Sequence, residues 1–168
     1  MVRRRLTLLR HAKSSWKDPS LDDFDRPLNQ RGEQDAPVMG RRLKARGARP
    51  SLFLTSKARR ARRTARLVAR EIGYPLEFLQ GERALYLASA DELLALLAGQ
   101  DDSFYDLLVC GHNPGLTDLA ARLSEARIDE LPTCGIVVLE GELASWRDLP
   151  GSRLELVYFD YPKKPVSG

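Results

Sequence analysis

Short runs of apolar residues, separated by polar segments, mark the chain from one end to the other. The runs are too short for helices and are rich in Leu, Val and Ile, as buried strands are. Turn-forming residues such as Pro, Gly, Asp and Ser lie between several of them. The pattern predicts strands at residues 4–9, 52–54, 76–79, 107–110, 136–139 and 154–159.

Four segments between these runs predict helices, at residues 31–46, 59–72, 89–97 and 116–123. The second is the clearest, because its apolar residues recur at helical spacing and Gly73 follows it as a C-cap. Ser89 and Glu92 form a capping-box sequence at the start of the third. Pro37 and Gly40 are expected to weaken the first.

Strands that alternate with helices at this spacing predict a mostly parallel sheet with helices on both faces. The predicted fold class is therefore α/β, a three-layer α/β/α sandwich. We expect a single domain over residues 1–168, with a frayed tail from about 162 to 168. In such a sheet, ligands bind beyond the carboxyl ends of the strands.

The composition is that of an ordinary globular protein and excludes several other classes. Apolar residues make up 43% and charged residues 30%, which excludes general disorder. No apolar run approaches the ~20 residues that span a bilayer. The basic start at residues 1–5 precedes the apolar run 6–9, which is shorter than the ~7–15 apolar residues of a signal peptide. Cys110 and Cys134 make no disulfide framework, so we expect a cytoplasmic protein.

The basic residues are concentrated in the first half of the chain. Residues 1–75 hold 20 of the 27 Lys and Arg but seven of the 23 Asp and Glu, so this part carries a formal charge of +13 and the remainder −9. Of the 27 basic residues, 21 are Arg. This asymmetry indicates an anionic partner, which composition alone leaves open among nucleic acid, a membrane surface and a phosphorylated ligand.

Both histidines of the chain come directly after predicted strands. Arg10 and His11 follow the first strand, and His112 follows the run at 107–110. A neutral imidazole is a nucleophile that attacks phosphorus readily, and arginine supplies fixed donors for a phosphoryl group. The Arg-rich segment 59–63 adds the positive end of a helix. Because phosphoryl transfer is mostly positioning and charge stabilisation, these residues suffice for it without a metal.

Four segments, in this order, carry a resemblance to a known family. They are residues 8–16 (LLRHAKSSW), residues 25–29 (DRPLN) with Arg31-Gly32, the set Ser56, Arg60-Ala61 and Thr64-Ala65, and residues 111–115 (GHNPG). With them the chain resembles the histidine phosphatase superfamily, also called phosphoglycerate mutase-like, and most closely its SixA-like phosphohistidine phosphatase branch. The resemblance implies the phosphoglycerate mutase-like fold, hydrolysis of a phosphorylated compound, and neither a metal nor a cofactor.

Carried over to these positions, the resemblance implies that His11 attacks the phosphoryl group and becomes transiently phosphorylated, after which water discharges it. Arg10, Arg60 and His112 surround the transferred group and stabilise its charge. Only the motif selects Arg60 among the five arginines of residues 59–66.

Four further residues are candidates for substrate binding or proton transfer. Ser14 and Arg26 would lie at the pocket mouth and contact phosphate or substrate, although an ion pair with an aspartate of residues 22–25 accounts for Arg26 equally well. The backbone around Asn113 would add a donor. Glu82 matches the proton donor of the wider family only loosely, and the alternative is a surface charge.

A weak proton donor favours a phosphohistidine protein as substrate, because imidazole leaves more easily than an alkoxide. The alternatives are a phosphomonoesterase for a small phosphorylated metabolite and a non-enzymatic module that binds phosphoprotein or nucleic acid. No basic stripe interleaved with aromatic residues supports specific nucleic-acid binding, and no segment indicates a membrane partner. A zinc site built from both histidines and both cysteines matches no common ligand spacing. The oligomeric state is not predicted.

Overall fold

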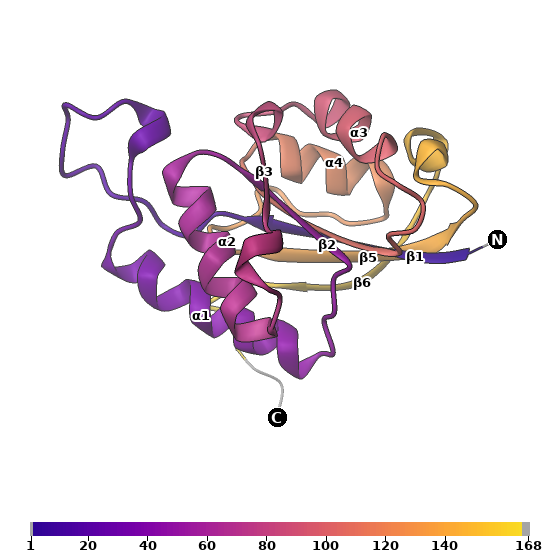
Figure 1. The fold of residues 1–168 in the computed structure, drawn as a ribbon, viewed down its shortest axis with the longest axis horizontal. Helices are drawn as coiled ribbons and strands as arrows, with labels where there is room; N and C mark the ends of the chain where they lie inside the picture. The colour runs from indigo at the N-terminus through magenta and orange to yellow at the C-terminus, as the bar shows by residue number, and fades with distance from the viewer. Residues whose placement is uncertain (1, 166–168) are drawn as a thin grey trace.

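The structure, a computed structural model that describes residues 2–165, is built around one six-stranded sheet (Figure 1). The strands lie in the order β3-β2-β4-β1-β5-β6. Their bounds are β1 Val2–Arg10, β2 Leu52–Ser56, β3 Gln80–Glu82, β4 Asp106–Gly111, β5 Ile136–Leu143 and β6 Glu155–Asp160.

The sheet is mostly parallel. β1 pairs with β4, β4 with β2, and β2 with β3, all in parallel, whereas β5 runs antiparallel to both β1 and β6. Only β5 therefore runs against the other strands. The carboxyl ends of β1, β2, β3 and β4 meet at one edge of the sheet, where ligands bind in such folds.

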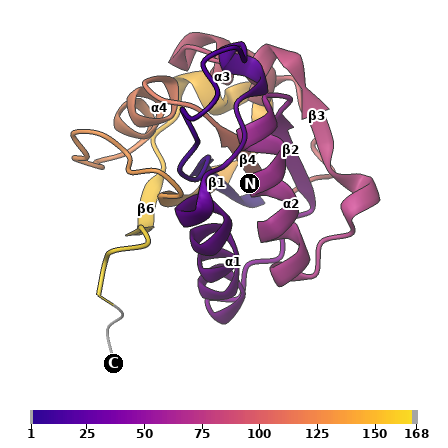
Figure 2. The same cartoon turned by 90° about the vertical axis from the view of Figure 1, so that its left-hand side faces the viewer.

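Helices cover both faces of the sheet. α1 (Gln30–Ala45) and α2 (Arg59–Ile72) lie on one face, and α3 (Ala90–Ala98) and α4 (Gly115–Leu123) lie on the other (Figures 1 and 2). Each face has its own cluster of buried apolar side chains. The predicted three-layer α/β/α sandwich is confirmed.

Four short 3-10 helices connect these elements: η1 Asp23–Asp25, η2 Leu76–Phe78, η3 Arg83–Leu85 and η4 Trp146–Gly151. Within the described range, no helix has the length and apolar character needed to cross a membrane.

Helix boundaries follow the local signals closely. α2 has the predicted bounds and ends at Gly73, whose φ of 78° is the left-handed conformation that glycine adopts without strain. The capping box of α3 forms, with Ser89 accepting from the Glu92 backbone and the Glu92 carboxylate accepting from the Ser89 backbone.

One local prediction is wrong. The run 76–79 forms η2 instead of a strand, and the edge strand β3 begins only at Gln80. Its three residues are Gln, Gly and Glu, which lack the apolar signature of a strand. Helix α1 runs through Pro37 and Gly40 without a break. Gly40 serves the packing of α1 against α2, because a Cβ there would lie 2.8 Å from the Cβ of Glu71.

The end of the described chain is held by side chains. Arg42 donates to the backbone oxygens of Tyr161 and Pro162, and the Lys164 ammonium donates to the backbone oxygen of Phe159. These contacts differ from the frayed tail expected from residue 162. The last part of that prediction, residues 166–168, lies outside the described residues.

Gly32, in the first turn of α1, allows the helix to approach the loop that follows β1. A Cβ at this position would lie 2.2 Å from the backbone oxygen of Lys13, far inside contact distance. Gly32→Ala is therefore expected to lower the free energy of unfolding by about 1–3 kcal/mol, as overpacking does. Urea unfolding measures the change. Gly151→Ala is the control, because a Cβ there meets nothing within 4 Å, and a loss of the same size in both variants would contradict the prediction.

Candidate active site

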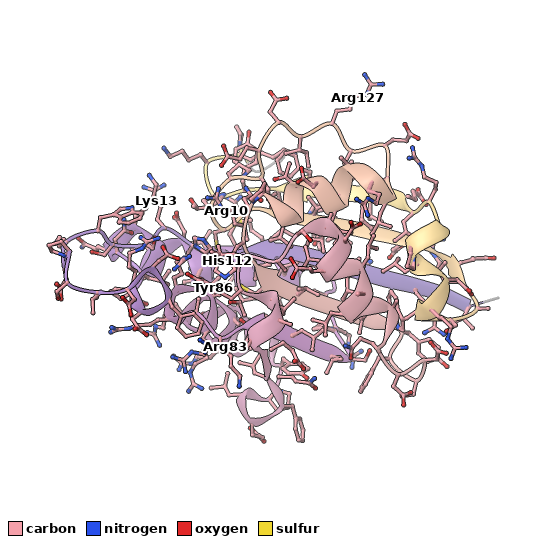
Figure 3. All side chains as sticks on the ribbon, turned by 90° about the horizontal axis from the view of Figure 1, so that it is seen from above. Arg10, Lys13, Arg83, Tyr86, His112 and Arg127 are labelled. Carbon is pink, nitrogen blue, oxygen red and sulfur yellow. The ribbon has the colours of Figure 1, made fainter. Side chains whose placement is uncertain are left out.

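The pairing of β1 with β4 brings the two histidines together. Arg10 at the end of β1 is in register with Gly111 at the end of β4, and the next residues are His11 and His112. The His11 backbone N–H donates to the Gly111 oxygen at 3.1 Å. The two imidazole rings lie 5.2 Å apart between centroids, and Figure 3 shows His112 and Arg10 at the same edge of the sheet.

The ring of His11 is held in one orientation and kept neutral. Its Nδ1 is 2.8 Å from the Ala12 backbone oxygen, which can only accept, so Nδ1 carries the proton and Nε2 has the lone pair. Burial of the ring lowers the pKa of His11 to about 3, and the charges of Arg60 and Arg10 act in the same direction. A neutral ring with its lone pair on Nε2 is the form that acts as a nucleophile.

His112 presents its other ring nitrogen to the site. Its Nε2 lies 2.8 Å from the Ser56 hydroxyl, at the end of β2. Its Nδ1 is buried without a hydrogen-bond partner among the described residues. When the Ser56 hydroxyl donates to Nε2, Nδ1 keeps its proton and is an unused donor. Burial and the charge of Arg60 lower the pKa of His112 to about 4.

Arg60, in the first turn of α2, is 3% exposed and reaches His11. Its Nε lies 3.4 Å from His11 Nε2, while its two terminal nitrogens donate to the backbone oxygen and the carboxylate of Asp23 at 2.6 and 2.9 Å. Asp23 also accepts hydrogen bonds from Tyr86 and Arg26. Burial opposes ionisation of Asp23, but the hydrogen bonds from Tyr86 and Arg60 outweigh it and lower its pKa to about 2.

Asp23 and Tyr86 are site residues that the sequence reasoning missed. Asp23 was considered only as an ion-pair partner of Arg26, and Tyr86 belongs to none of the four motifs. Its ring packs edge-on against His112 at 5.4 Å between centroids, and Figure 3 shows the two side by side. For Asp23 the signal in the sequence was weak: an aspartate in the segment that follows the first motif.

Arg10 directly precedes His11 at the end of β1. Its Nη1 donates to the Leu131 backbone oxygen at 2.9 Å, and its Nε is buried with no partner within the described part of the chain. The Asn113 side chain donates to the same Leu131 oxygen at 2.8 Å and accepts from Thr117. The amide of Asn113 therefore positions the loop beside Arg10.

Arg26 and Ser14 meet in the loop after β1. The Arg26 guanidinium lies 3.1 Å from Asp23 and donates to the Ser14 hydroxyl at 2.7 Å, with its carbon 3.5 Å above the Trp16 ring. The ion-pair alternative for Arg26 is thus the one that the structure contains. A substrate contact by either residue stays a prediction.

Glu82 ends β3 opposite Ser56, so it reaches the same edge of the sheet as His112. Its carboxylate accepts from the Gln80 side chain at 2.7 Å, and no hydrogen bond to a histidine is found within residues 2–165.

Cys110 is fully buried, and burial raises the pKa of its thiol to about 12. In the same range, no three His, Cys, Asp or Glu side chains are grouped to hold a metal ion.

Taken together, these side chains form a site for a phosphoryl anion. Two buried donors next to His11, the Nε of Arg10 and the Nδ1 of His112, have no protein partner among the described residues, and buried polar groups normally have one. Guanidinium and imidazole N–H groups are donors that suit phosphoryl oxygens. Arg60 adds a second positive group beside the lone pair of His11 Nε2. The fold and the site define an α/β protein of phosphoryl chemistry with paired histidines.

Comparisons with known proteins agree with this class. A family model of the histidine phosphatase superfamily (branch 1) matches residues 6–84. An uncharacterised chloroplastic protein of Arabidopsis thaliana is 34% identical over 160 residues, which cover 88% of this chain and 71% of that protein. A structure assigned as phosphohistidine phosphatase SixA from Agrobacterium tumefaciens is 31% identical, with a TM-score of 0.80 over 95% of this chain and 98% of that one.

A mycobacterial glucosyl-3-phosphoglycerate phosphatase shares the fold at 16% identity, with a TM-score of 0.69 over 93% of this chain and 98% of that one. The chain belongs to the histidine phosphatase superfamily and is a phosphatase.

The two neutral histidines make stability depend on pH. In the unfolded chain each ring binds a proton near a pKa of about 6.5, whereas the folded pKa is about 3 for His11 and about 4 for His112. The unfolded state binds more protons below pH ~6.5, so stability falls toward pH ~4 by up to ~1.4 kcal/mol per pH unit for each ring. Asp106, whose pKa burial raises to about 6, acts in the opposite direction.

Urea unfolding at about pH 7 and about pH 4.5 isolates this effect when the wild type is compared with His11→Gln/His112→Gln. All other titrating groups are common to both proteins. The wild type should lose roughly 3–5 kcal/mol more than the double variant between the two pH values. An equal loss in both proteins would mean that the histidines are not buried as neutral rings.

Arg60 uses three nitrogens in a fixed planar arrangement, which lysine does not reproduce. Arg60→Lys is expected to lower kcat by about 10²–10³, the usual cost of losing one oriented donor at a developing charge. Steady-state kinetics on any phosphorylated compound that the wild type hydrolyses measures the loss. Arg70→Lys, at an exposed position of the same helix, is the control and should stay within about twofold. Equal kcat values for Arg60→Lys and the wild type would contradict the role of Arg60.

Proposed function

We propose that this phosphatase hydrolyses phosphohistidine on proteins through a phosphoryl intermediate on His11. The observation that carries the proposal is the state of His11: a buried neutral ring, with Nδ1 fixed by the Ala12 oxygen and Nε2 beside Arg60. Such a ring is a ready nucleophile for phosphorus.

In the first step the lone pair of His11 Nε2 forms a bond to phosphorus while the P–N bond of the substrate breaks. The electron pair of that bond goes to the departing imidazole nitrogen, which takes a proton from solvent. Arg10, Arg60 and the Nδ1–H of His112 hold the phosphoryl oxygens as charge develops. In the second step water attacks phosphorus, the P–Nε2 bond breaks, and inorganic phosphate leaves with a restored neutral His11.

The absence of an acid next to His11 in the described residues favours a phosphoramidate substrate over an ester. Asp23 has a pKa of about 2, so it is ionised at neutral pH and has no proton to donate. The Tyr86 hydroxyl already donates a hydrogen bond to Asp23, and the Glu82 carboxylate accepts one from the Gln80 side chain. An imidazole leaves without much help, whereas an alkoxide needs a proton donor.

The second candidate substrate is a small phosphomonoester. The observation in its favour is Glu82, which ends β3 in register with Ser56 and would need only a side-chain rotation to reach a leaving group at this edge. The glucosyl-3-phosphoglycerate phosphatase named above acts on such a compound with the same fold.

The test compares kcat/KM on a phosphohistidine protein with kcat/KM on a panel of phosphorylated metabolites, in buffer with EDTA. The wild type should prefer phosphohistidine, and His11→Ala should lose at least ~10³-fold on every substrate. Glu82→Gln is the discriminating variant, because it should leave phosphohistidine hydrolysis unchanged.

Three outcomes would overturn the proposal. Full activity of His11→Ala would show that His11 is not the nucleophile. A wild type that prefers one metabolite, together with a Glu82→Gln variant that loses that activity, would establish the phosphomonoesterase. Loss of activity in EDTA, restored by a metal ion, would contradict a mechanism based on histidine and arginine alone.

A further inference from the structure

The exposed side of α2 carries more positive charge than the site itself uses. Arg59, Arg62, Arg63 and Arg66, which we call the α2 arginine face, line a hollow of about 450 Å³. The apolar side chains of Leu28 and Leu79 contribute to its walls. None of these four arginines is the buried Arg60.

Most of this charge is not neutralised by the protein. Arg63 pairs with Glu33 at 3.1 Å, but Arg59, Arg62 and Arg66 have no carboxylate within salt-bridge distance among residues 2–165. Since α2 rises ~1.5 Å per residue, the face extends over ~10 Å of the helix. Elsewhere on the surface, arginines are divided between those that pair with a carboxylate, such as Arg3 and Arg122, and those with none within that distance among the described residues, such as Arg127.

Two residues that line the hollow are chain neighbours of active-site residues. Thr55, which also lines it, directly precedes Ser56, whose hydroxyl bonds to His112. Arg59 directly precedes Arg60, whose Nε faces His11. The α2 arginine face thus begins one residue from Arg60, on the helix that brings Arg60 to His11.

We infer that the α2 arginine face binds an acidic segment of the protein that carries the phosphohistidine. The inference rests on the proposed function and specifies the chemistry of the substrate around the phosphorylated residue. A phosphoryl group alone fills the site between His11 and His112 and leaves the hollow unused. Carboxylates are good acceptors for guanidinium groups, and Glu33 is one example on this face, with both of its oxygens accepting at 3.1 Å from the Nε of Arg63.

The lining of the hollow favours a protein over a nucleic acid. No aromatic side chain is among the described residues that line it, so unpaired bases find no ring on which to stack. Apolar walls at Leu28 and Leu79 suit the side chains of a peptide. The excess of arginine in the first half of the chain thereby gains a specific role.

The experiment uses three substrates: a phosphohistidine peptide flanked by Asp and Glu, the same peptide with Asn and Gln in their place, and free phosphohistidine. The wild type should have a kcat/KM at least roughly tenfold higher for the acidic peptide than for the neutral one, and most of this preference should disappear at ~0.5 M salt. Arg62→Gln/Arg66→Gln should lose most of the preference through KM, with kcat/KM for free phosphohistidine within about twofold of the wild type.

The control is Arg127→Gln/Arg147→Gln, which changes the net charge equally. Both side chains are exposed, and Figure 3 shows Arg127 well away from His112. This variant should keep the preference. The inference is overturned when the wild type has no preference, when Arg62→Gln/Arg66→Gln keeps it, or when the control loses as much.

Two further outcomes separate the claims. Hydrolysis of phosphohistidine without an acidic preference would overturn this inference and leave the proposed function intact, whereas no hydrolysis of any of the three phosphohistidine substrates would overturn both. A further test is inhibition by a single-stranded oligonucleotide. The face would be assigned to nucleic acid if the oligonucleotide inhibited the wild type more strongly than a non-phosphorylated acidic peptide does, and if it inhibited Arg62→Gln/Arg66→Gln less than the wild type.

Discussion

The parallel hydrogen bonding of β1 and β4 is the constraint on which the site depends. With Arg10 opposite Gly111, the two chains leave the sheet side by side, and the residues that follow are His11 and His112. A shift of one residue in this pairing would turn every side chain of one strand to the opposite face. Both strands are buried on both faces, so packing against two layers of helices holds the register. The distance between the imidazole rings is thus set by the core of the protein and not by the loops.

Burial keeps the histidines of the site neutral, and it also makes a charged group there unfavourable. Rings that are almost completely removed from water stay neutral, which keeps the Nε2 lone pair of His11 available at neutral pH. The same burial would make an unpaired Arg60 unfavourable, and the ionised Asp23 compensates its charge. Asp23 links the loop after β1, the first turn of α2 and, through Tyr86, the end of η3. An anion entering this network meets positive groups that are already oriented.

The sequence predicts most of the architecture, because apolar runs and helix caps are local signals. The bounds of α2 and the capping box of α3 follow from a few neighbouring residues. β3 was missed, because an edge strand of three polar residues owes its position to pairing with β2. The same distinction holds for the site. Residues that directly follow strands could be expected to meet, whereas Asp23 and Tyr86 come together from a loop and a 3-10 helix whose positions only the folded chain determines.

We expect the phosphoryl group to be transferred to one particular atom, Nε2 of His11. Rapid acid-free quenching during turnover, followed by peptide mapping and NMR of the phosphorylated ring, identifies both the residue and the nitrogen. Because Nδ1 is hydrogen-bonded to the Ala12 oxygen, we expect the phosphate on Nε2 of His11. Phosphate on His112, or on Nδ1 of His11, would contradict it.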